Sequence, residues 1–330
     1  PGYIGSAGQP PRTGPNDTAR EWLLAHGYAL AGAQPVGTGW AVEEIMPDAV
    51  ATIDVVRSRF GAPRRTLAWG TSMGGQVAAG LLQEYPERFD GAVALCASVA
   101  GPLGMLNAGL DASFAFKQLL APGSDLELVH VTDEAARGSQ ARAVLDAAQA
   151  TPQGRARIAL AAAFAQLSTW SVTGTPEPAP HDYAAQQEQQ YQAFMFAVFS
   201  PRQPLEQRAG GNFSWNTGVD YRRQLAGSGR ERQVRALYRA AGLDLEKDLR
   251  TLERAPRISA DPEAVEYMRR NVTPTGELSD PILTLHETGD NAPTVTQARA
   301  YADAVAAQGN ARFLRQAFVH RPGHCGYTAA

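Results

Sequence analysis

Residues 65–82 read RTLAWGTSMGGQVAAGLL, and this stretch decides the fold of the chain. The apolar run at 65–69 predicts a short buried strand, and residues 76–82 follow the 3.6-residue repeat of a helix. Between them stands GTSMG, a Gly-x-Ser-x-Gly motif centred on Ser72, which predicts a very tight strand-to-helix turn. Its glycines are expected because a Cβ there would collide with neighbouring backbone. The turn would hold the Ser72 hydroxyl above the free N–H groups of a helix N-terminus, where negative charge is favoured.

A serine in this setting is a candidate acyl-transfer nucleophile, and it needs an acid and then a histidine later in the chain. Residues 281–286 predict another buried strand, and the polar turn at 287–291 follows it. Asp290 lies in that turn, at the carboxyl end of the strand, where such an acid belongs. Glu287 is the alternative acid. Strand alternation and the Gly-Asp turn favour Asp290.

The candidate histidine follows the last predicted strand. A helix is expected over 294–308 and a strand over 311–319, which runs into the sequence HRPGHCGY. His320 directly ends that strand, whereas His324 lies in a glycine-flanked loop that can bring its imidazole over the serine. We favour His324 as the general base that takes the serine proton and returns it to the leaving group.

Three motifs together resemble the α/β-hydrolase family: the elbow around Ser72, the Gly289-Asp290 turn and the Gly323-His324-Cys325 loop. The resemblance covers residues 1–100 and 278–330. It implies an α/β fold with a mostly parallel sheet, a fourth strand over 27–33 and a helix over 43–60 that leads into the nucleophile strand. It also implies a serine hydrolase that cleaves a carboxylic ester of a small molecule through an acyl-enzyme, without a cofactor.

The family pattern also implies an oxyanion hole built from two backbone N–H groups. The first belongs to Met73, the residue after the nucleophile. The second is expected from Tyr3, because the opening sequence PGYIG matches the family's oxyanion loop. Since strands normally precede that loop, we expect the N-terminal strands of the family sheet to be absent from this chain.

The segment 101–277 interrupts the hydrolase pattern after the sixth strand of the family, and by resemblance it is a large all-helical cap. Helices are expected over 112–120, 133–150, 152–168, 183–199, 219–242 and 262–270. The apolar stripe within 191–199 predicts cap core. Candidate pocket residues are Trp40, Trp170 and Trp215, the last in a loop at 211–218 whose mixture of amides, hydroxyls and aromatics is typical of a pocket wall.

Composition excludes several classes of function. The chain has 330 residues, with 30 Lys+Arg against 33 Asp+Glu and a net charge of −3, so no basic field for nucleic acid is expected. No run of apolar residues is long enough for a transmembrane helix, and no metal site is predicted from the histidine spacing. The two cysteines, Cys96 and Cys325, are expected to remain apart because of the family strand order. Localisation is not indicated.

Other functions fit part of the sequence. An acyltransferase similar to homoserine acetyltransferase is one alternative, since the Met73-Gly74-Gly75 sequence after the serine also occurs in such enzymes. A prolyl-type peptidase is a second, because caps on this fold also accompany peptide cleavage. A binding protein on a disabled hydrolase scaffold is a third, and the presence of all three triad residues argues against it.

Overall fold

The computed structural model describes residues 14, 16–33 and 39–327. Its sheet has four parallel strands in the order β1 (Leu67–Thr71), β2 (Gly91–Leu95), β3 (Ile282–Gly289) and β4 (Leu314–Pro322). Because all four strands run the same way, their carboxyl ends meet at one edge, which is where ligands bind in open α/β sheets. The predicted α/β fold with a parallel sheet is confirmed.

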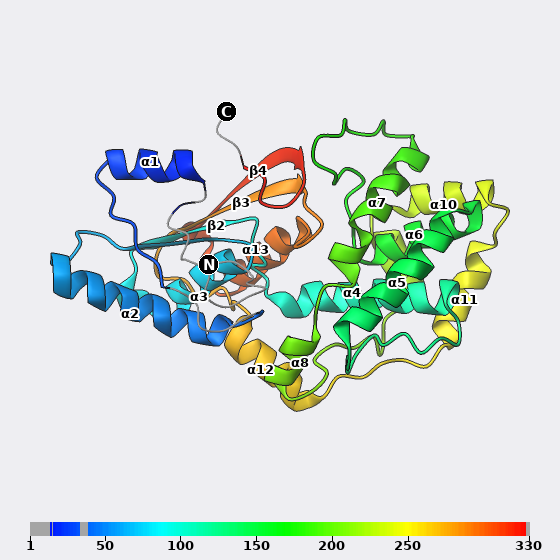
Figure 1. The fold of residues 1–330 in the computed structure, drawn as a ribbon, viewed down its shortest axis with the longest axis horizontal. Helices are drawn as coiled ribbons and strands as arrows, with labels where there is room; N and C mark the ends of the chain where they lie inside the picture. The colour runs from blue at the N-terminus through cyan, green and yellow to red at the C-terminus, as the bar shows by residue number, and fades with distance from the viewer. Residues whose placement is uncertain (1–13, 15, 34–38, 328–330) are drawn as a thin grey trace.

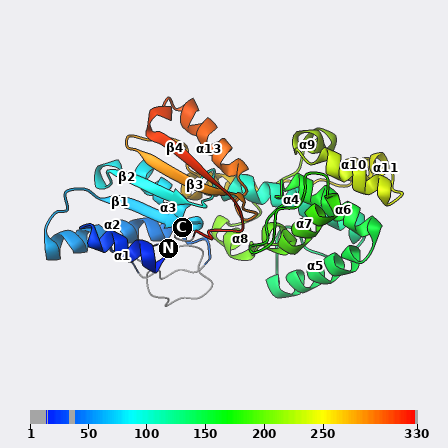
Figure 2. The same ribbon diagram turned by 90° about the horizontal axis from the view of Figure 1, so that it is seen from above.

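The molecule has two lobes, one built on the sheet and one built of helices (Figures 1 and 2). Each lobe has its own apolar core: one includes Met73, Leu82 and Tyr301, and the other includes Phe164 and Phe194. Helix α4 (Pro102–Leu120) runs from the sheet lobe into the helical lobe. The helical lobe therefore follows β2 directly.

The sheet lobe is covered by helices from both ends of the chain. They are α1 (Asp17–Ala25), α2 (Val42–Phe60), α3 (Met73–Glu84), η1 (Pro86–Arg88), α12 (Pro262–Val272), α13 (Thr296–Ala307) and η2 (Ala311–Phe313). Helix α3 packs against β1 and β2 and buries most of its length, which its small residues allow. It therefore anchors the turn that precedes it.

The helical lobe surrounds one central helix. Its members after α4 are α5 (Glu134–Gln149), α6 (Pro152–Phe164), α7 (Tyr183–Val198), α9 (Tyr221–Gly227), α10 (Glu231–Ala240) and α11 (Leu245–Arg254), while α8 (Gln203–Ala209) packs on α12 of the sheet lobe. Helix α6 is the centre, because its residues from Ile158 to Phe164 are all fully buried. Side-chain caps from Asp133, Thr151 and Asp182 begin three of these helices, since each accepts a hydrogen bond from a free N–H of the first turn.

Most predicted helices are present, and the prediction that the stripe within 191–199 is core is confirmed, because it lies in the apolar core of the helical lobe. The segment 205–213 and α12 lie inside the 101–277 insertion, but several of their residues are buried in the sheet-lobe core. The division into a core and a cap at residues 100 and 278 stays a prediction. In the part of the chain that the structure describes, no helix combines the length and apolar character of a membrane span.

Several predicted elements were wrong. Residues 28–33 form no strand and pair with none of the four described strands, although β1 lies at the edge of the described sheet. The helix expected over 219–242 is two helices, separated where Gly229 takes a φ of 71°. Residues 287–289 belong to β3 and contain a register shift, rather than starting a turn.

Candidate active site

Ser72 lies on a strained turn between β1 and α3. Its φ of 55° and ψ of −125° are unusual for a residue with a side chain, and such strain is typical of a nucleophile elbow. Its N–H donates to the Leu95 carbonyl at 2.9 Å. A Cβ on Gly70 would overlap the Gly74 carbonyl, and one on Gly75 would lie 2.5 Å from the Ala97 Cβ. The turn is thus compatible with glycine alone at Gly70.

Ser72, His324 and Asp290 form one hydrogen-bonded chain. The Ser72 hydroxyl lies 2.9 Å from His324 Nε2, and His324 Nδ1 lies 2.7 Å from Asp290 Oδ2. Because a carboxylate only accepts hydrogen bonds, Nδ1 carries the proton and Nε2 accepts from the serine. The three residues come from the ends of β1, β3 and β4, which the parallel sheet brings to the same edge.

The Asp290 carboxylate is completely buried beneath the histidine. Its Oδ1 accepts the Ala292 N–H at 2.8 Å, which fixes the carboxylate in its turn. A second buried histidine, His286, lies 3.7 Å from Oδ2 and donates from Nε2 to the Pro293 carbonyl at 2.8 Å. A buried carboxylate whose Oδ1 is fixed by the backbone presents Oδ2 to His324 and is suited to orient its imidazole.

The two alternatives considered from the sequence lie elsewhere. Glu287 is fully buried, and its Oε1 accepts the Gly326 N–H at 2.7 Å, so it binds the backbone of the histidine loop. His320 lies within β4, and its ring is paired with Glu177 and Thr288 on the surface. Neither is in the hydrogen-bonded chain with Ser72.

The two cysteines form a disulfide, so the expectation that they remain apart was wrong. Cys96 directly follows β2 and is fully buried, and Cys325 directly follows His324. Strand order places two strands between the ends of β1 and β4, but the histidine loop has to cross the ends of β3 and β2 to reach Ser72. Cys325 is thereby carried to the end of β2, 229 residues away in the chain.

The predicted oxyanion donors differ in what the structure describes. Met73 is completely buried. Because it is the first residue of α3, its N–H has no carbonyl one turn earlier to bind, and it directly follows Ser72. Tyr3 lies outside the described residues. The second donor stays a prediction from the sequence.

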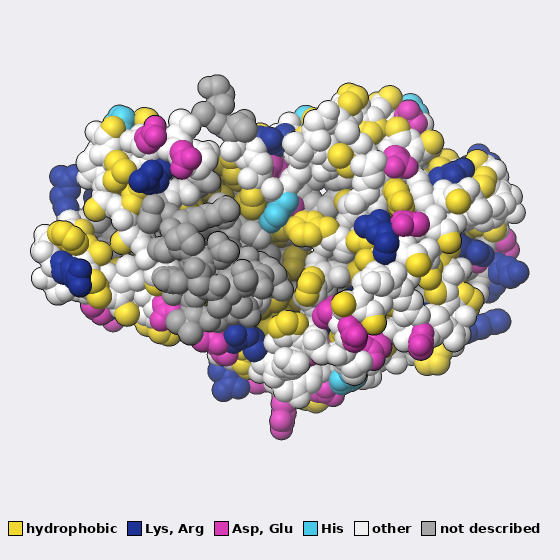
Figure 3. Space-filling view, viewed as in Figure 1, with side chains coloured by type: hydrophobic (Ala, Val, Ile, Leu, Met, Phe, Trp, Pro, Cys, Tyr) yellow, Lys and Arg dark blue, Asp and Glu magenta, His cyan; other side chains and the backbone are white. Residues whose placement is uncertain are grey.

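An exposed aromatic ring from the helical lobe lies beside His324. Phe196 on α7 is 57% exposed, although its neighbours on that helix are in the core, and its ring centroid lies 6.0 Å from that of His324. The apolar stripe predicted from the sequence does not include Phe196, because this residue lies off the buried face of α7. Figure 3 shows hydrophobic side chains gathered at the waist between the lobes, beside a histidine.

The predicted pocket tryptophans occupy three different environments. Trp40 is buried in the sheet-lobe core, in the same cluster as Met73. Trp170 is half-buried, and its ring lies 5.2 Å from that of His320. Trp215 is half-buried, and its backbone N–H donates to the Asn107 Oδ1 at 3.2 Å. Their role in a pocket stays a prediction.

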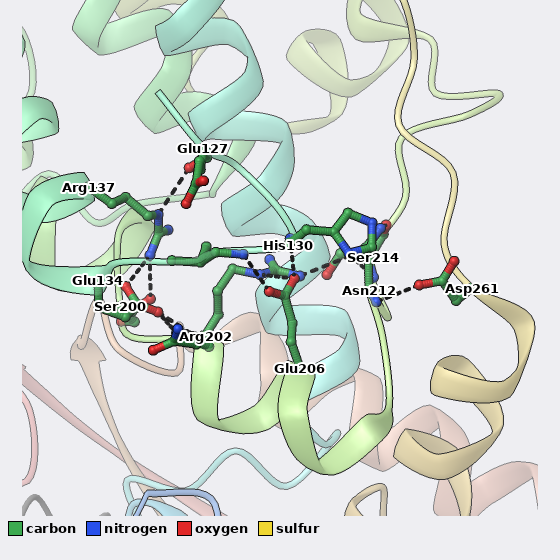
Figure 4. Close-up of polar contacts among 12 residues, drawn as sticks. Glu127, His130, Glu134, Arg137, Ser200, Arg202, Glu206, Asn212, Ser214 and Asp261 are labelled. Carbon is green, nitrogen blue, oxygen red and sulfur yellow. Dashed lines mark hydrogen bonds and ion pairs between the residues drawn. The ribbon is translucent and has the colours of Figure 1, made fainter. Parts of the chain in front are cut away.

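A polar cluster at the base of the helical lobe is a structural brace (Figure 4). Arg202 donates to Glu206 at 2.9 Å and to Asn212 at 3.1 Å, and the Glu206 carboxylate also accepts the N–H groups of His130 and Val131. Burial lowers the pKa of the Arg202 guanidinium, and the neighbouring Glu206 opposes that effect. The charges are paired internally, as buried charges require, so the cluster offers nothing to a ligand.

The two amide side chains of the loop at 211–218 are hydrogen-bonded within the protein. Asn212 donates to the Ser214 and Ser259 carbonyls, and Asn216 donates to the Tyr221 hydroxyl at 2.9 Å. Both amides are completely buried. These two amides are therefore used inside the protein, and a pocket role for the rest of the loop stays a prediction.

One group of potential metal ligands occurs among the described residues. Cys96, His324 and Cys325 place three ligand atoms within 4.8 Å of one another. Both sulfur atoms are consumed by the disulfide, however, and both imidazole nitrogens are hydrogen-bonded to Asp290 and Ser72. The oxidised site therefore has no free lone pair that suits a metal.

Comparison with known proteins places the chain in a family. An o-phthalyl amidase from Xanthobacter agilis is 32% identical over 348 aligned residues, which cover 96% of this chain and 76% of that protein. The profile of a family described as serine aminopeptidase, S33, matches residues 26–177. The chain belongs to the α/β-hydrolase superfamily. It is a hydrolase.

Solved structures of other hydrolases are similar at low identity. Feruloyl esterase B from Aspergillus oryzae matches with a TM-score of 0.40 and 12% identity, over 86% of this hydrolase and 57% of that chain. The 2-hydroxy-6-oxo-6-phenylhexa-2,4-dienoate hydrolase from Rhodococcus sp. strain RHA1 matches with a TM-score of 0.31 and 14% identity, over 88% of this hydrolase and 68% of that chain. This hydrolase thus spans less than two thirds of the feruloyl esterase.

Proposed function

We propose that this hydrolase cleaves a carboxylic ester through a Ser72–His324–Asp290 triad and an acyl-enzyme. The observation that carries the proposal is the unbroken hydrogen-bonded chain from the serine hydroxyl through the imidazole to a buried carboxylate. The strained backbone at Ser72 supports it, because that turn exposes the hydroxyl at the carboxyl edge of the sheet.

The reaction follows from the proton positions. His324 Nε2 takes the Ser72 proton as the oxygen attacks the acyl carbon, and Asp290 stabilises the imidazolium through Nδ1. The imidazolium then protonates the leaving alcohol. Water attacks the acyl-enzyme by the same route, which releases the acid and restores Ser72.

The oxyanion of each tetrahedral intermediate needs preorganised donors. The Met73 N–H supplies one, aided by the N-terminal end of the α3 dipole, and such a donor is worth about 3 kcal/mol in the transition state. The second is proposed to be the N–H of Tyr3. Closure of the helical lobe over this edge would exclude water from the reaction.

An amide substrate is the second candidate. The relative from Xanthobacter agilis is named o-phthalyl amidase, and the matching family profile is described as a serine aminopeptidase. The same triad serves an amide, because His324 can protonate the leaving nitrogen. The exposed Phe196 ring beside His324 would give an aromatic acyl group an apolar surface in either case.

The experiment begins with a fluorophosphonate probe on the folded protein. We expect the probe to label wild-type protein on Ser72 and to leave Ser72→Ala unlabelled. The substitution should lower ester hydrolysis by roughly 10⁴-fold or more, since triad residues act as a unit. Absence of labelling in folded wild-type protein would overturn the proposed chemistry.

Matched substrates then separate ester from amide cleavage. The p-nitrophenyl ester and the p-nitroanilide of one aromatic acid give the same acyl-enzyme, so they differ only in the acylation step. An esterase cleaves the ester and leaves the anilide intact, whereas an amidase turns over both. Added alcohol tests for acyl transfer, which would appear as a new ester in place of the free acid.

A further inference from the structure

The loop that carries His324 has to hold its imidazole far from the strand that it follows. It leaves β4 after Pro322, turns at Gly323 with a φ of 98° and reaches back to the end of β1. Beyond the histidine, Gly326 donates to Glu287 and the Tyr327 hydroxyl donates to the Leu285 carbonyl at 2.8 Å. These bonds fasten the loop two and three residues after His324, and they leave the residue next to the imidazole to be fixed by other means.

The Cys96–Cys325 disulfide supplies that attachment. Cys96 is a rigid anchor, because it is fully buried directly after β2 and its N–H donates to the Leu285 carbonyl at 2.7 Å. Cys325 is bonded to it and is the neighbour of His324 in the chain. The covalent link therefore joins the histidine loop to the central part of the sheet edge.

The disulfide also contacts the imidazole itself. Cys325 Sγ lies 3.5 Å from His324 Nε2 and 3.7 Å from Nδ1. The two distances are nearly equal, so the sulfur lies in line with neither ring nitrogen. The in-plane directions are taken by Ser72 and Asp290. The sulfur thus touches the ring away from these two hydrogen bonds and limits its movement, and contacts of sulfur with aromatic rings are favourable.

We propose that the Cys96–Cys325 disulfide is a positioning crosslink, which keeps the His324 imidazole aligned with Ser72 and Asp290 during catalysis. The inference rests on the proposed role of His324 as general base. Without the link, the loop can shift by a fraction of a residue length and the ring can tilt, so proton transfer from Ser72 loses its alignment. A misplacement of about 1 Å at a reacting group costs roughly 10²-fold in rate.

The test compares oxidised and reduced enzyme. Two successive thiol–disulfide exchanges with dithiothreitol convert the disulfide into two thiols, while the reagent forms its cyclic disulfide. The chain contains two cysteines in total, so a thiol titration reports on this bond alone. We expect kcat for the ester to fall roughly 10²-fold on reduction with KM nearly unchanged, and to return on reoxidation. Circular dichroism should show the same fold in both states.

Variants make the result independent of how readily the bond is reduced. Cys96→Ala breaks the link and is expected to show the same loss of kcat with KM nearly unchanged. The double variant Cys96→Ala/Cys325→Ala is the matched control, because it should have the low kcat and show no response to dithiothreitol. An undiminished kcat in folded Cys96→Ala, or in reduced enzyme with two titrated thiols, would overturn the proposal.

Two further outcomes separate this proposal from others. If kcat falls only in parallel with loss of the folded circular dichroism signal, the disulfide is a stabilising staple and the positioning role is wrong. If the oxidised wild-type protein neither hydrolyses ester nor reacts with the fluorophosphonate, the proposed function fails first. If the oxidised enzyme is active and reduction leaves its kcat unchanged, the positioning role is wrong and the proposed function stands.

Discussion

The carboxyl group of Asp111 should make the stability of the helical lobe depend on pH. Asp111 is buried in α4, where Tyr221 donates to Oδ1 at 3.0 Å and Gln224 donates to Oδ2 at 2.9 Å. Burial raises the pKa of the carboxyl from 3.8 to about 6, and these two hydrogen bonds and the charge of Arg257 oppose the shift only in part. The ionised carboxylate is therefore a cost to the folded state.

The sign and size follow from linkage. Below about pH 4 the carboxyl is protonated in both the folded and the unfolded chain, so its burial costs no ionisation energy. As pH rises through the folded pKa of about 6, the unfolded chain ionises more easily than the folded chain, and the folded state loses stability. The pKa difference corresponds to about 3 kcal/mol less stability above pH 6 than below pH 4. Asp111→Asn should remove this dependence. The Gln224 Oε1 atom is buried without a hydrogen-bond partner, so rotation of that amide would give the new side chain an acceptor.

The assay is urea unfolding of wild-type protein and Asp111→Asn at several pH values between about 4 and about 7. The quantity of interest is the difference in unfolding free energy between the two proteins, because the other titrating groups cancel in it. We expect that difference to change by about 3 kcal/mol in favour of the variant as pH rises. Asp248→Asn is the control: its carboxylate is paired with Arg157 at 2.8 Å, so the variant should lose stability at neutral pH. A difference for Asp111→Asn that is constant across this range would refute the reasoning.

Three other outcomes follow from the site. Asp290→Asn should lower kcat/KM by roughly 10⁴-fold in folded protein, because an amide no longer fixes the histidine tautomer. Glu287→Gln keeps the oxygen that accepts the Gly326 N–H, so it should lower kcat/KM far less. Steady-state kinetics of the two variants test the difference. Gly70→Ala should destroy the elbow, seen as loss of probe labelling and a lower melting temperature, while Gly138→Ala, with open space around the new Cβ, should leave both intact. Phe196→Ala should raise KM for a benzoyl ester by about tenfold and leave an acetyl ester unchanged, since about 1.4 kcal/mol of apolar contact is lost; equal effects on both esters would contradict this.

Local chemistry explains which parts of the fold were predictable from the sequence. The elbow at Ser72 needs glycine at fixed offsets, and a helix such as α7 over Tyr183–Val198 shows its apolar period over several turns. The strand that the resemblance implies over 27–33 is not formed, because a strand depends on a partner that can lie anywhere in the chain, and its own residues contain no information about that partner. The break between α9 and α10 was missed because Gly229 is one residue in a strongly helical stretch.

Contacts made by the helical lobe were the least predictable part of the site. Phe196 faces His324 only because α7 is oriented by packing around α6, and the same helical period that identified the buried stripe places Phe196 off that stripe. Glu287 is the alternative acid in the sequence because it is near Asp290. In the structure its strand position directs it beneath Gly326 instead.

The disulfide shows how sheet order and site geometry have to be combined. Strand order alone separates the end of β2 from the end of β4, and for that reason Cys96 and Cys325 were expected to remain apart. A histidine on the β4 loop can reach a nucleophile after β1 only by crossing the ends of β3 and β2, so the residue beside it necessarily passes over β2. The assignment of Ser72 and His324 to one site therefore already implies that Cys325 lies near Cys96. The same crossing carries the loop away from its own strand and over the ends of two others, which is the physical reason that a covalent link next to the imidazole would matter for catalysis.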